Sequence, residues 1–210
     1  KLVAIPQEVV AYGLFVNKDM FDDYGLELPE TPEEFLECCR VFKENGIETP
    51  VGANRWWLET FVLAQAYADL YNGGNTEAEV AALNSGERKY SDYMRPGFAF
   101  LQELIDCGYI DAEKALVSEA IEGEGPDFLA QKTPIVMAYW GAANSDTAYG
   151  APDFELQVIG FPSSRGQMPV MPMTGMAIGV GSEHAEDAMR ALDVMTSDEA
   201  LQVYTETNKV

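Results

Sequence analysis

Residues 12–46 read YGLFVNKDMFDDYGLELPETPEEFLECCRVFKENG, and they carry start and stop signals for three successive elements. The apolar run at 14–16 is typical of a buried strand, and a short amphipathic stretch with Met20 and Phe21 follows it. Gly25 ends that stretch, because glycine readily adopts the left-handed conformation that closes a helix. The sequence therefore predicts a strand, a short helix and then a longer helix.

The longer helix has a full set of N-terminal signals. Thr31 is expected at the N-cap and Pro32 at the first helical position, while Glu34 can bond back to the cap as a capping box. Apolar residues recur at positions 35, 38, 39 and 42 with helical spacing, and Asn45-Gly46 supplies the C-terminal stop. The segment from Pro32 to Asn45 is thus predicted as an amphipathic helix.

The composition is that of a globular and strongly acidic protein. The 210 residues are 47% hydrophobic, with a formal net charge of −22 and an isoelectric point near 4.1. This charge repels phosphate backbones and anionic lipids, so nucleic-acid and membrane-surface partners are not expected. It would suit a cationic ligand such as a polyamine, although a solvated acidic surface explains it more simply.

Residues for metal, redox or cofactor chemistry are few. Three cysteines give no disulfide framework, and all three are expected to be buried thiols. The single histidine, His184, excludes multi-histidine metal sites, and its place in the first turn of a helix disfavours a catalytic role. Gly179 and Gly181 superficially resemble a dinucleotide fingerprint, but His184 replaces the third glycine, so a tight turn is expected. We expect no metal and no cofactor.

Helices and strands alternate along the rest of the chain, which predicts an α/β class with a largely parallel sheet flanked by helices. Ser163–Pro172 is the only plausible linker. A strand at Gly175–Val180 is expected after it, and then a helix whose apolar stripe includes Met189, Leu192 and Met195.

Several motifs resemble extracellular solute-binding proteins of family 1, the ABC transporter sugar-binding proteins that include maltose-binding protein. The stretch at 12–46 resembles their most recognisable signature. LNSGERKYSD (83–92), FLQELIDCGYI (100–110), DFLAQKTPIVMAYWG (127–141) and MTGMAIGVGSEHAEDAMRALDVMTSDEALQVYTE (173–206) are similar to later elements of the family, in the same order. One departure is Gln131, where the family usually has a glycine before the lysine.

This resemblance implies a type II periplasmic-binding-protein fold, in which two α/β lobes close on a sugar or oligosaccharide and the closed form docks on membrane permease subunits. Such a protein is extracellular, as a cell-surface lipoprotein or in a periplasm. Residues 1–162 would form the second, C-terminal lobe, 163–174 the hinge or linker, and 175–210 a strand and helices of the first lobe. The chain is thus expected to be a fragment that binds sugar weakly or not at all, and to repack, dimerise or swap through its C-terminal helices.

Aromatic residues are the best candidates for ligand contacts. In Arg55-Trp56-Trp57-Leu58-Glu59 the two tryptophans are about 100° apart on a helix, so both cannot face the core. Tyr139 and Trp140 follow a strongly apolar strand, at the end where open α/β sheets bind ligands. Flat aromatic faces suit sugar rings, and nearby polar groups can satisfy the hydroxyls, although packing in the core remains an alternative for the tryptophans.

The resemblance adds further positions to this set. Its stacking aromatics match Trp56 or Trp57 and Trp140, whereas the family's ligand carboxylate near the first hinge strand falls on Val10, where Gln7 or Tyr12 could replace it. Backbone contacts are implied for the second crossover. The predicted ligand-binding residues are Gln7, Tyr12, Arg55, Trp56, Trp57, Glu59, Tyr139, Trp140, Thr174 and Gly175.

Two other functions stay open at this point. The same fold could bind a polyamine or another cationic solute. A carboxylate-dependent glycoside hydrolase would need two carboxyl groups facing each other across a cleft. The adjacent pairs Asp22-Asp23 and Glu33-Glu34 lie instead in a polar turn and a helix opening, where solvated roles are expected. We therefore predict a binding protein and not an enzyme.

Overall fold

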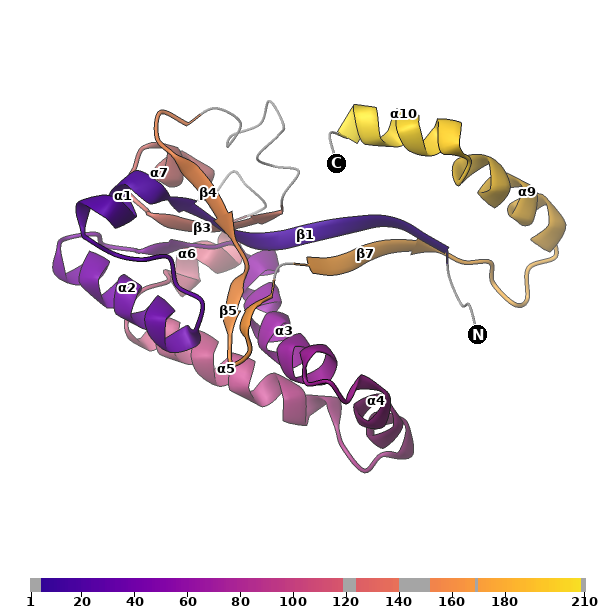
Figure 1. Cartoon of the computed structure of the whole chain (residues 1–210), viewed down its shortest axis with the longest axis horizontal. Helices are drawn as coiled ribbons and strands as arrows, with labels where there is room; N and C mark the ends of the chain where they lie inside the picture. The colour runs from indigo at the N-terminus through magenta and orange to yellow at the C-terminus, as the bar shows by residue number, and fades with distance from the viewer. Residues whose placement is uncertain (1–4, 119–123, 140–151, 169, 209–210) are drawn as a thin grey trace.

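The structure is a computed structural model that describes residues 5–118, 124–139, 152–168 and 170–208 (Figure 1). The helices are α1 (Lys18–Asp23), α2 (Pro32–Glu44), α3 (Arg55–Asn72), α4 (Thr76–Ser85), α5 (Tyr90–Asp106), α6 (Ala112–Val117), α7 (Gly125–Leu129), α9 (Ala185–Met195) and α10 (Asp198–Asn208). The strands are β1 (Ile5–Asn17), β2 (Val51–Gly52), β3 (Ile135–Tyr139), β4 (Leu156–Ile159), β5 (Phe161–Ser163), β6 (Gly166–Met168) and β7 (Val170–Met176). Within these ranges no helix is both long enough and apolar enough to span a bilayer.

The predicted order of strand, short helix and capped helix is confirmed. The Asn17 side chain accepts the Met20 N–H at 3.1 Å and so caps α1. At α2 the Thr31 hydroxyl accepts the Glu34 N–H at 3.3 Å, and the Glu34 carboxylate accepts the Thr31 N–H at 3.1 Å. These reciprocal bonds satisfy two backbone donors that the first turn of a helix leaves unpaired, which fixes the start of α2.

The α/β class is confirmed, but the prediction of a largely parallel sheet is wrong. The strand order is β2-β3-β1-β4, and among the described strands of this sheet only β2 and β3 pair in parallel. Strand β1 pairs antiparallel with β3 on one side and with β4 on the other. Strands β2, β3 and β4 therefore run in the same direction, as the alternation with helices predicts, but β1 lies between β3 and β4 and runs against both.

Strand β1 extends beyond this sheet. Its second half, from Tyr12, pairs with β3 and β4, whereas its first half pairs antiparallel with β7, from Ile5 opposite Met176 to Ala11 opposite Val170. These two strands form a ribbon that leads from the α/β body to α9 and α10 (Figure 1). The strand expected at Gly175–Val180 is thus placed too late, and residues 163–174 contribute to β5, β6 and β7. The proposed lobe and hinge boundaries remain a prediction.

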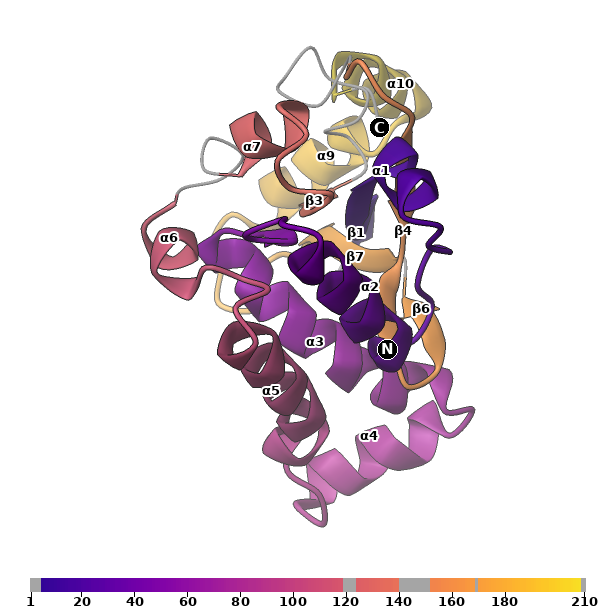
Figure 2. The same cartoon turned by 90° about the vertical axis from the view of Figure 1, so that its left-hand side faces the viewer.

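The main core lies where α2, α3 and α5 cover the sheet. Phe35, Phe61 and Phe100, one from each helix, are buried with ring centroids 5.9–6.0 Å apart. Gly97 permits the close approach of α5 to α3, because a Cβ there would lie 2.5 Å from the Val62 carbonyl oxygen. Helices α3 and α5 therefore pack side by side, with α6 near their upper ends (Figure 2).

Two smaller predictions change. Cys38 and Cys39 are buried as expected, but Cys107 is exposed because it lies at the C-terminal end of α5. The acidic sequence at 122–127 contains two glycines and a proline, which predicts a loop, but its last residues belong to α7, and residues 122–123 lie outside the described residues.

The two C-terminal helices have no core of their own. No side chain of α9 is buried, and Met189, Val194, Met195 and Val203 are exposed. The expected dimerisation, swapping or repacking through these helices stays a prediction.

Candidate functional site

The N-terminus of α3 follows directly from the edge strand β2. Asn54 is buried between them, and its side-chain Oδ1 accepts the backbone N–H groups of Trp56 at 3.0 Å and Trp57 at 3.2 Å. An N-cap asparagine satisfies donors that the first turn of a helix leaves unpaired. This cap therefore fixes where α3 begins and in which directions its first side chains project.

The two adjacent tryptophans have opposite environments. Trp57 is 8% exposed and belongs to the main core, whereas Trp56 is 55% exposed. The guanidinium carbon of Arg55 lies 4.9 Å from the centroid of the Trp56 ring, within the range of a cation–π interaction. Of the two predicted stacking residues, only Trp56 thus offers an indole face to a ligand.

Trp56 borders a shallow groove between α3, α5 and α6. The groove has a volume of about 700 Å³, and two of its most exposed apolar side chains are Phe98 at 56% and Leu116 at 63%. Its remaining lining is Arg55, Leu58, Glu59, Val62, Leu63, Met94 and Leu101. The structure thus brings three predicted site residues, Arg55, Trp56 and Glu59, to one mainly apolar surface.

A buried carboxyl group lies behind this surface. Glu124, at the start of α7, is 2% exposed, and its Oε1 accepts a hydrogen bond of 2.9 Å from Asn54 Nδ2. Gly52 makes room for it, because a Cβ there would lie 3.0 Å from the Glu124 Cβ. Residues 70 positions apart in the sequence are thereby joined beneath the N-terminus of α3.

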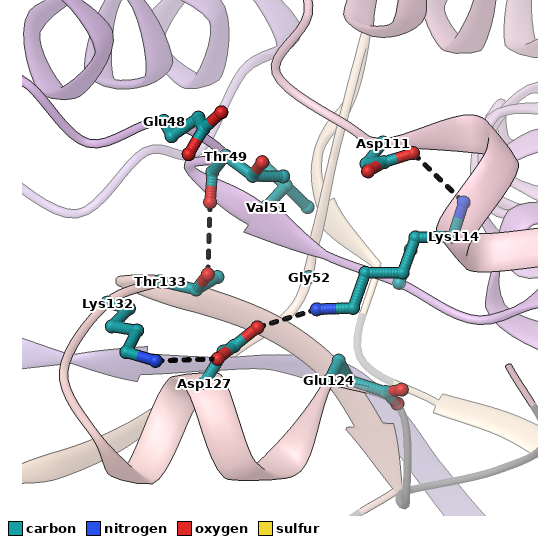
Figure 3. A pocket seen from close by; sticks show the side chains of 11 residues that line it. Glu48, Thr49, Val51, Gly52, Asp111, Lys114, Glu124, Asp127, Lys132 and Thr133 are labelled. Atoms are coloured by element: carbon teal, nitrogen blue, oxygen red, sulfur yellow. Dashed lines mark hydrogen bonds and ion pairs between the residues drawn. The ribbon is translucent and has the colours of Figure 1, made fainter.

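Burial raises the pKa of Glu124 to about 7, against the opposing effects of the hydrogen bond from Asn54, the Trp57 side chain and the charge of Lys114. Glu124 also lines a small polar cavity of about 130 Å³ (Figure 3). There Lys114 and Lys132 bind Asp127 at 2.6 and 3.4 Å, and the Glu124 carboxylate is turned away from that cluster. Among the described residues, no group of acidic, histidine or cysteine side chains is arranged to hold a metal ion.

The other predicted site residues lie on the strands. Tyr12 in β1 and Tyr139 at the end of β3 are backbone partners, so the structure places their backbones side by side at one end of the β1–β3 pairing. Gln7 lies in the first half of β1, and Thr174 and Gly175 lie in β7, opposite Glu8 and Pro6. These three belong to the ribbon. Trp140 lies outside the described residues.

The residues that sequence analysis missed are Asn54, Phe98, Leu116 and Glu124. Asn54 carried a readable signal, since asparagine directly before an apolar helical pattern is a common N-cap. Phe98 and Leu116 carried no such signal in the sequence, because the exposure of one apolar residue on a helix depends on which helices pack around it. The carboxylate pairs that a hydrolase would use have local roles: Asp22 pairs with Lys18 and Glu34 caps α2.

Comparisons with known proteins agree on the fold. A family model described as bacterial extracellular solute-binding protein matches residues 1–202. No curated protein sequence matches the chain. A family 1 extracellular solute-binding protein from Bifidobacterium longum subsp. infantis is 21% identical, with a TM-score of 0.72 over 97% of this chain and 53% of that one.

Two similar structures contain sugars. A sugar transporter from Bacillus licheniformis in complex with stachyose is 21% identical, with a TM-score of 0.66 over 95% of this chain and 53% of that one. The solute-binding protein RafE in complex with raffinose is also 21% identical, with a TM-score of 0.67 over 99% of this chain and 55% of that one. At this identity the likeness shows the fold, and the chain spans about half the length of these structures.

Proposed function

Because the chain belongs to the bacterial extracellular solute-binding proteins, as the match over residues 1–202 shows, we propose that it is part of the solute-binding component of an ABC transporter and takes up a sugar or an oligosaccharide. It would deliver this solute to membrane permease subunits from the cell surface, as a lipoprotein, or from a periplasm. It would bind without a cofactor and catalyse no reaction.

The observation that carries this proposal is the exposed Trp56 at the capped N-terminus of α3. Its indole presents an apolar face beside Arg55 and Glu59, whose side chains can bond sugar hydroxyls. Solved structures with this fold contain stachyose and raffinose. Tyr12, Tyr139 and Trp140 would contribute further aromatic contacts, and Gln7, Thr174 and Gly175 would contribute from the ribbon.

A neutral sugar fits this surface better than a cationic solute. Although the net charge of −22 would attract a polyamine, the Arg55 guanidinium already lies over the Trp56 ring. A cation approaching that ring would meet a like charge, whereas a sugar ring would not.

Saturation-transfer difference NMR of stachyose with the 210-residue chain tests the proposal, because it detects weak binding. Weak binding is expected, since the groove is open and leaves the indole more than half exposed. Trp56→Ala should remove most of the transferred signal. Tyr71→Ala is the matched control, because Tyr71 is 50% exposed on the same helix and lies outside the groove.

An equal loss in both variants, or no signal with stachyose or raffinose in the unmodified chain, would count against the proposed site. Spermidine that displaces stachyose, with a strong dependence on salt, would favour the cationic solute instead. Unchanged proton spectra of the sugar after prolonged incubation are expected of a binding protein, whereas released monosaccharides would indicate a hydrolase.

A further inference from the structure

We propose that Glu124 is a positioning residue for the ligand-binding end of α3, and that it acts through Asn54 in a proton-dependent way. The proposal deepens the proposed function, since it concerns how the Arg55–Trp56 pair is held. Its structural part can be tested without any ligand.

The first step is geometric. Asn54 has one side-chain oxygen and one side-chain NH₂ group, and both are in use. The NH₂ group donates to Glu124 Oε1 at 2.9 Å, which leaves Oδ1 facing the backbone N–H groups of Trp56 and Trp57 at 3.0 and 3.2 Å. Glu124 thereby selects the amide orientation in which Asn54 can cap α3.

The second step is the effect of a proton. An ionised carboxylate can only accept hydrogen bonds, so it requires the NH₂ group of Asn54 and leaves Oδ1 to the helix. A protonated carboxyl has lost the charge that strengthens its bond from the Asn54 NH₂ group, so it holds this amide orientation less firmly. Protonation should therefore loosen the cap and with it the first turn of α3. Burial raises the pKa of Glu124 to about 7, which brings this change into the physiological range.

The third step is the charge around Glu124. The cavity beside it is lined by Glu48 before β2, by Asp111 and Lys114 at α6, and by Asp127 and Lys132 at α7. Asp127 binds both lysines. The charge of Lys114 is therefore already engaged. On the α3 side Asn54 donates to Glu124 Oε1, and the Trp57 side chain also lowers the pKa of Glu124 through a hydrogen bond.

The test is ¹⁹F NMR of the 210-residue chain labelled with 5-fluorotryptophan, with resonances assigned by Trp56→Phe and Trp57→Phe. Both resonances should shift with a common midpoint near pH 7. In Glu124→Gln, which keeps the shape and cannot ionise, neither should shift. His184→Gln should keep both titrations, which separates Glu124 from the histidine, the side chain that commonly titrates near neutrality.

The Asn54→Ser variant tests whether Asn54 transmits the protonation of Glu124 to Trp56. Serine keeps an oxygen that can cap α3 but has no amide group to reach Glu124. In this variant the Trp57 resonance should still titrate, because the Trp57 side chain is itself a hydrogen-bond partner of Glu124. The Trp56 resonance should become independent of pH. A Trp56 titration that persists in Asn54→Ser, or in Glu124→Gln, would overturn the proposal.

The consequence for binding is measured separately. A charge-assisted hydrogen bond contributes about twice as much as a neutral one, so stachyose should bind about fivefold more weakly at pH 5.5 than at pH 8. The Glu124→Gln variant should bind stachyose with the same affinity at both pH values. Absent stachyose binding would contradict the proposed function and leave the ¹⁹F result standing. Binding that is independent of pH in the unmodified chain, beside a normal ¹⁹F titration, would show that the cap does not control the site.

Discussion

The stability of the Glu124→Gln variant, relative to that of wild type, should increase as the pH rises. The pKa of Glu124 is about 7 in the folded protein, against 4.5 for an unperturbed glutamate. Between these values the folded state binds more protons than the unfolded state. The Glu124 contribution to the free energy of unfolding therefore falls as the pH rises from 4.5, and the loss is complete above about 7.

The difference of about 2.5 pKa units corresponds to up to about 3 kcal/mol, at about 1.4 kcal/mol for each unit. Glutamine cannot ionise, so the variant lacks this contribution. Between pH 5 and pH 8 the unfolding free energy of the variant should therefore rise by most of that amount relative to the unfolding free energy of wild type.

Urea denaturation followed by circular dichroism at both pH values measures this shift. Comparing variant with wild type at each pH cancels other titrating groups, including Glu34 and Asp127, whose pKa values are lowered by hydrogen bonds and so give the opposite slope. Glu48→Gln is the matched control, because Glu48 is an exposed carboxylate lining the same cavity. If the Glu124→Gln difference is the same at pH 5 and pH 8, the assignment of a buried, proton-binding Glu124 is refuted.

Other substitutions test the packing and the caps by urea denaturation. Gly97→Ala should cost about 1–3 kcal/mol, because the new Cβ would meet the backbone of α3 at 2.5 Å; Gly179→Ala, which meets nothing within 4 Å, should cost little. Thr31→Ala should cost about 1 kcal/mol through loss of the α2 cap, and Thr31→Ser should recover most of it. Phe61→Ala should cost about 3–5 kcal/mol, and Tyr71→Ala much less; equal costs would contradict the burial of Phe61.

Local signals in the sequence predicted the helices well, because caps and stops act over a few residues. Thr31, Pro32 and Glu34 locate the start of α2, and the structure contains those bonds. Strand direction was not predictable in the same way. The position of β1 between β3 and β4 depends on pairing with residues far along the chain, which neither alternation nor composition reports.

The candidate site shows the same limit. Helical spacing required that one of Trp56 and Trp57 be exposed, but the choice depends on how the Asn54 cap and the buried Phe61 set the rotation of α3. Glu124 belongs to an acidic segment whose sequence predicts exposure to solvent. Its contact with Asn54, 70 residues earlier, and the close approach of β2 at Gly52 depend on the tertiary fold.

The position of β1 also has a consequence for the order of folding. Strand β1 is made before its partners β3, β4 and β7, which begin only at Ile135, Leu156 and Val170. During synthesis its pairing with these three strands therefore cannot form while α1 to α7 are made. The sheet can close only late, after a large loop-closure entropy is overcome, so slow folding and a need for chaperone protection of the nascent β1 are expected.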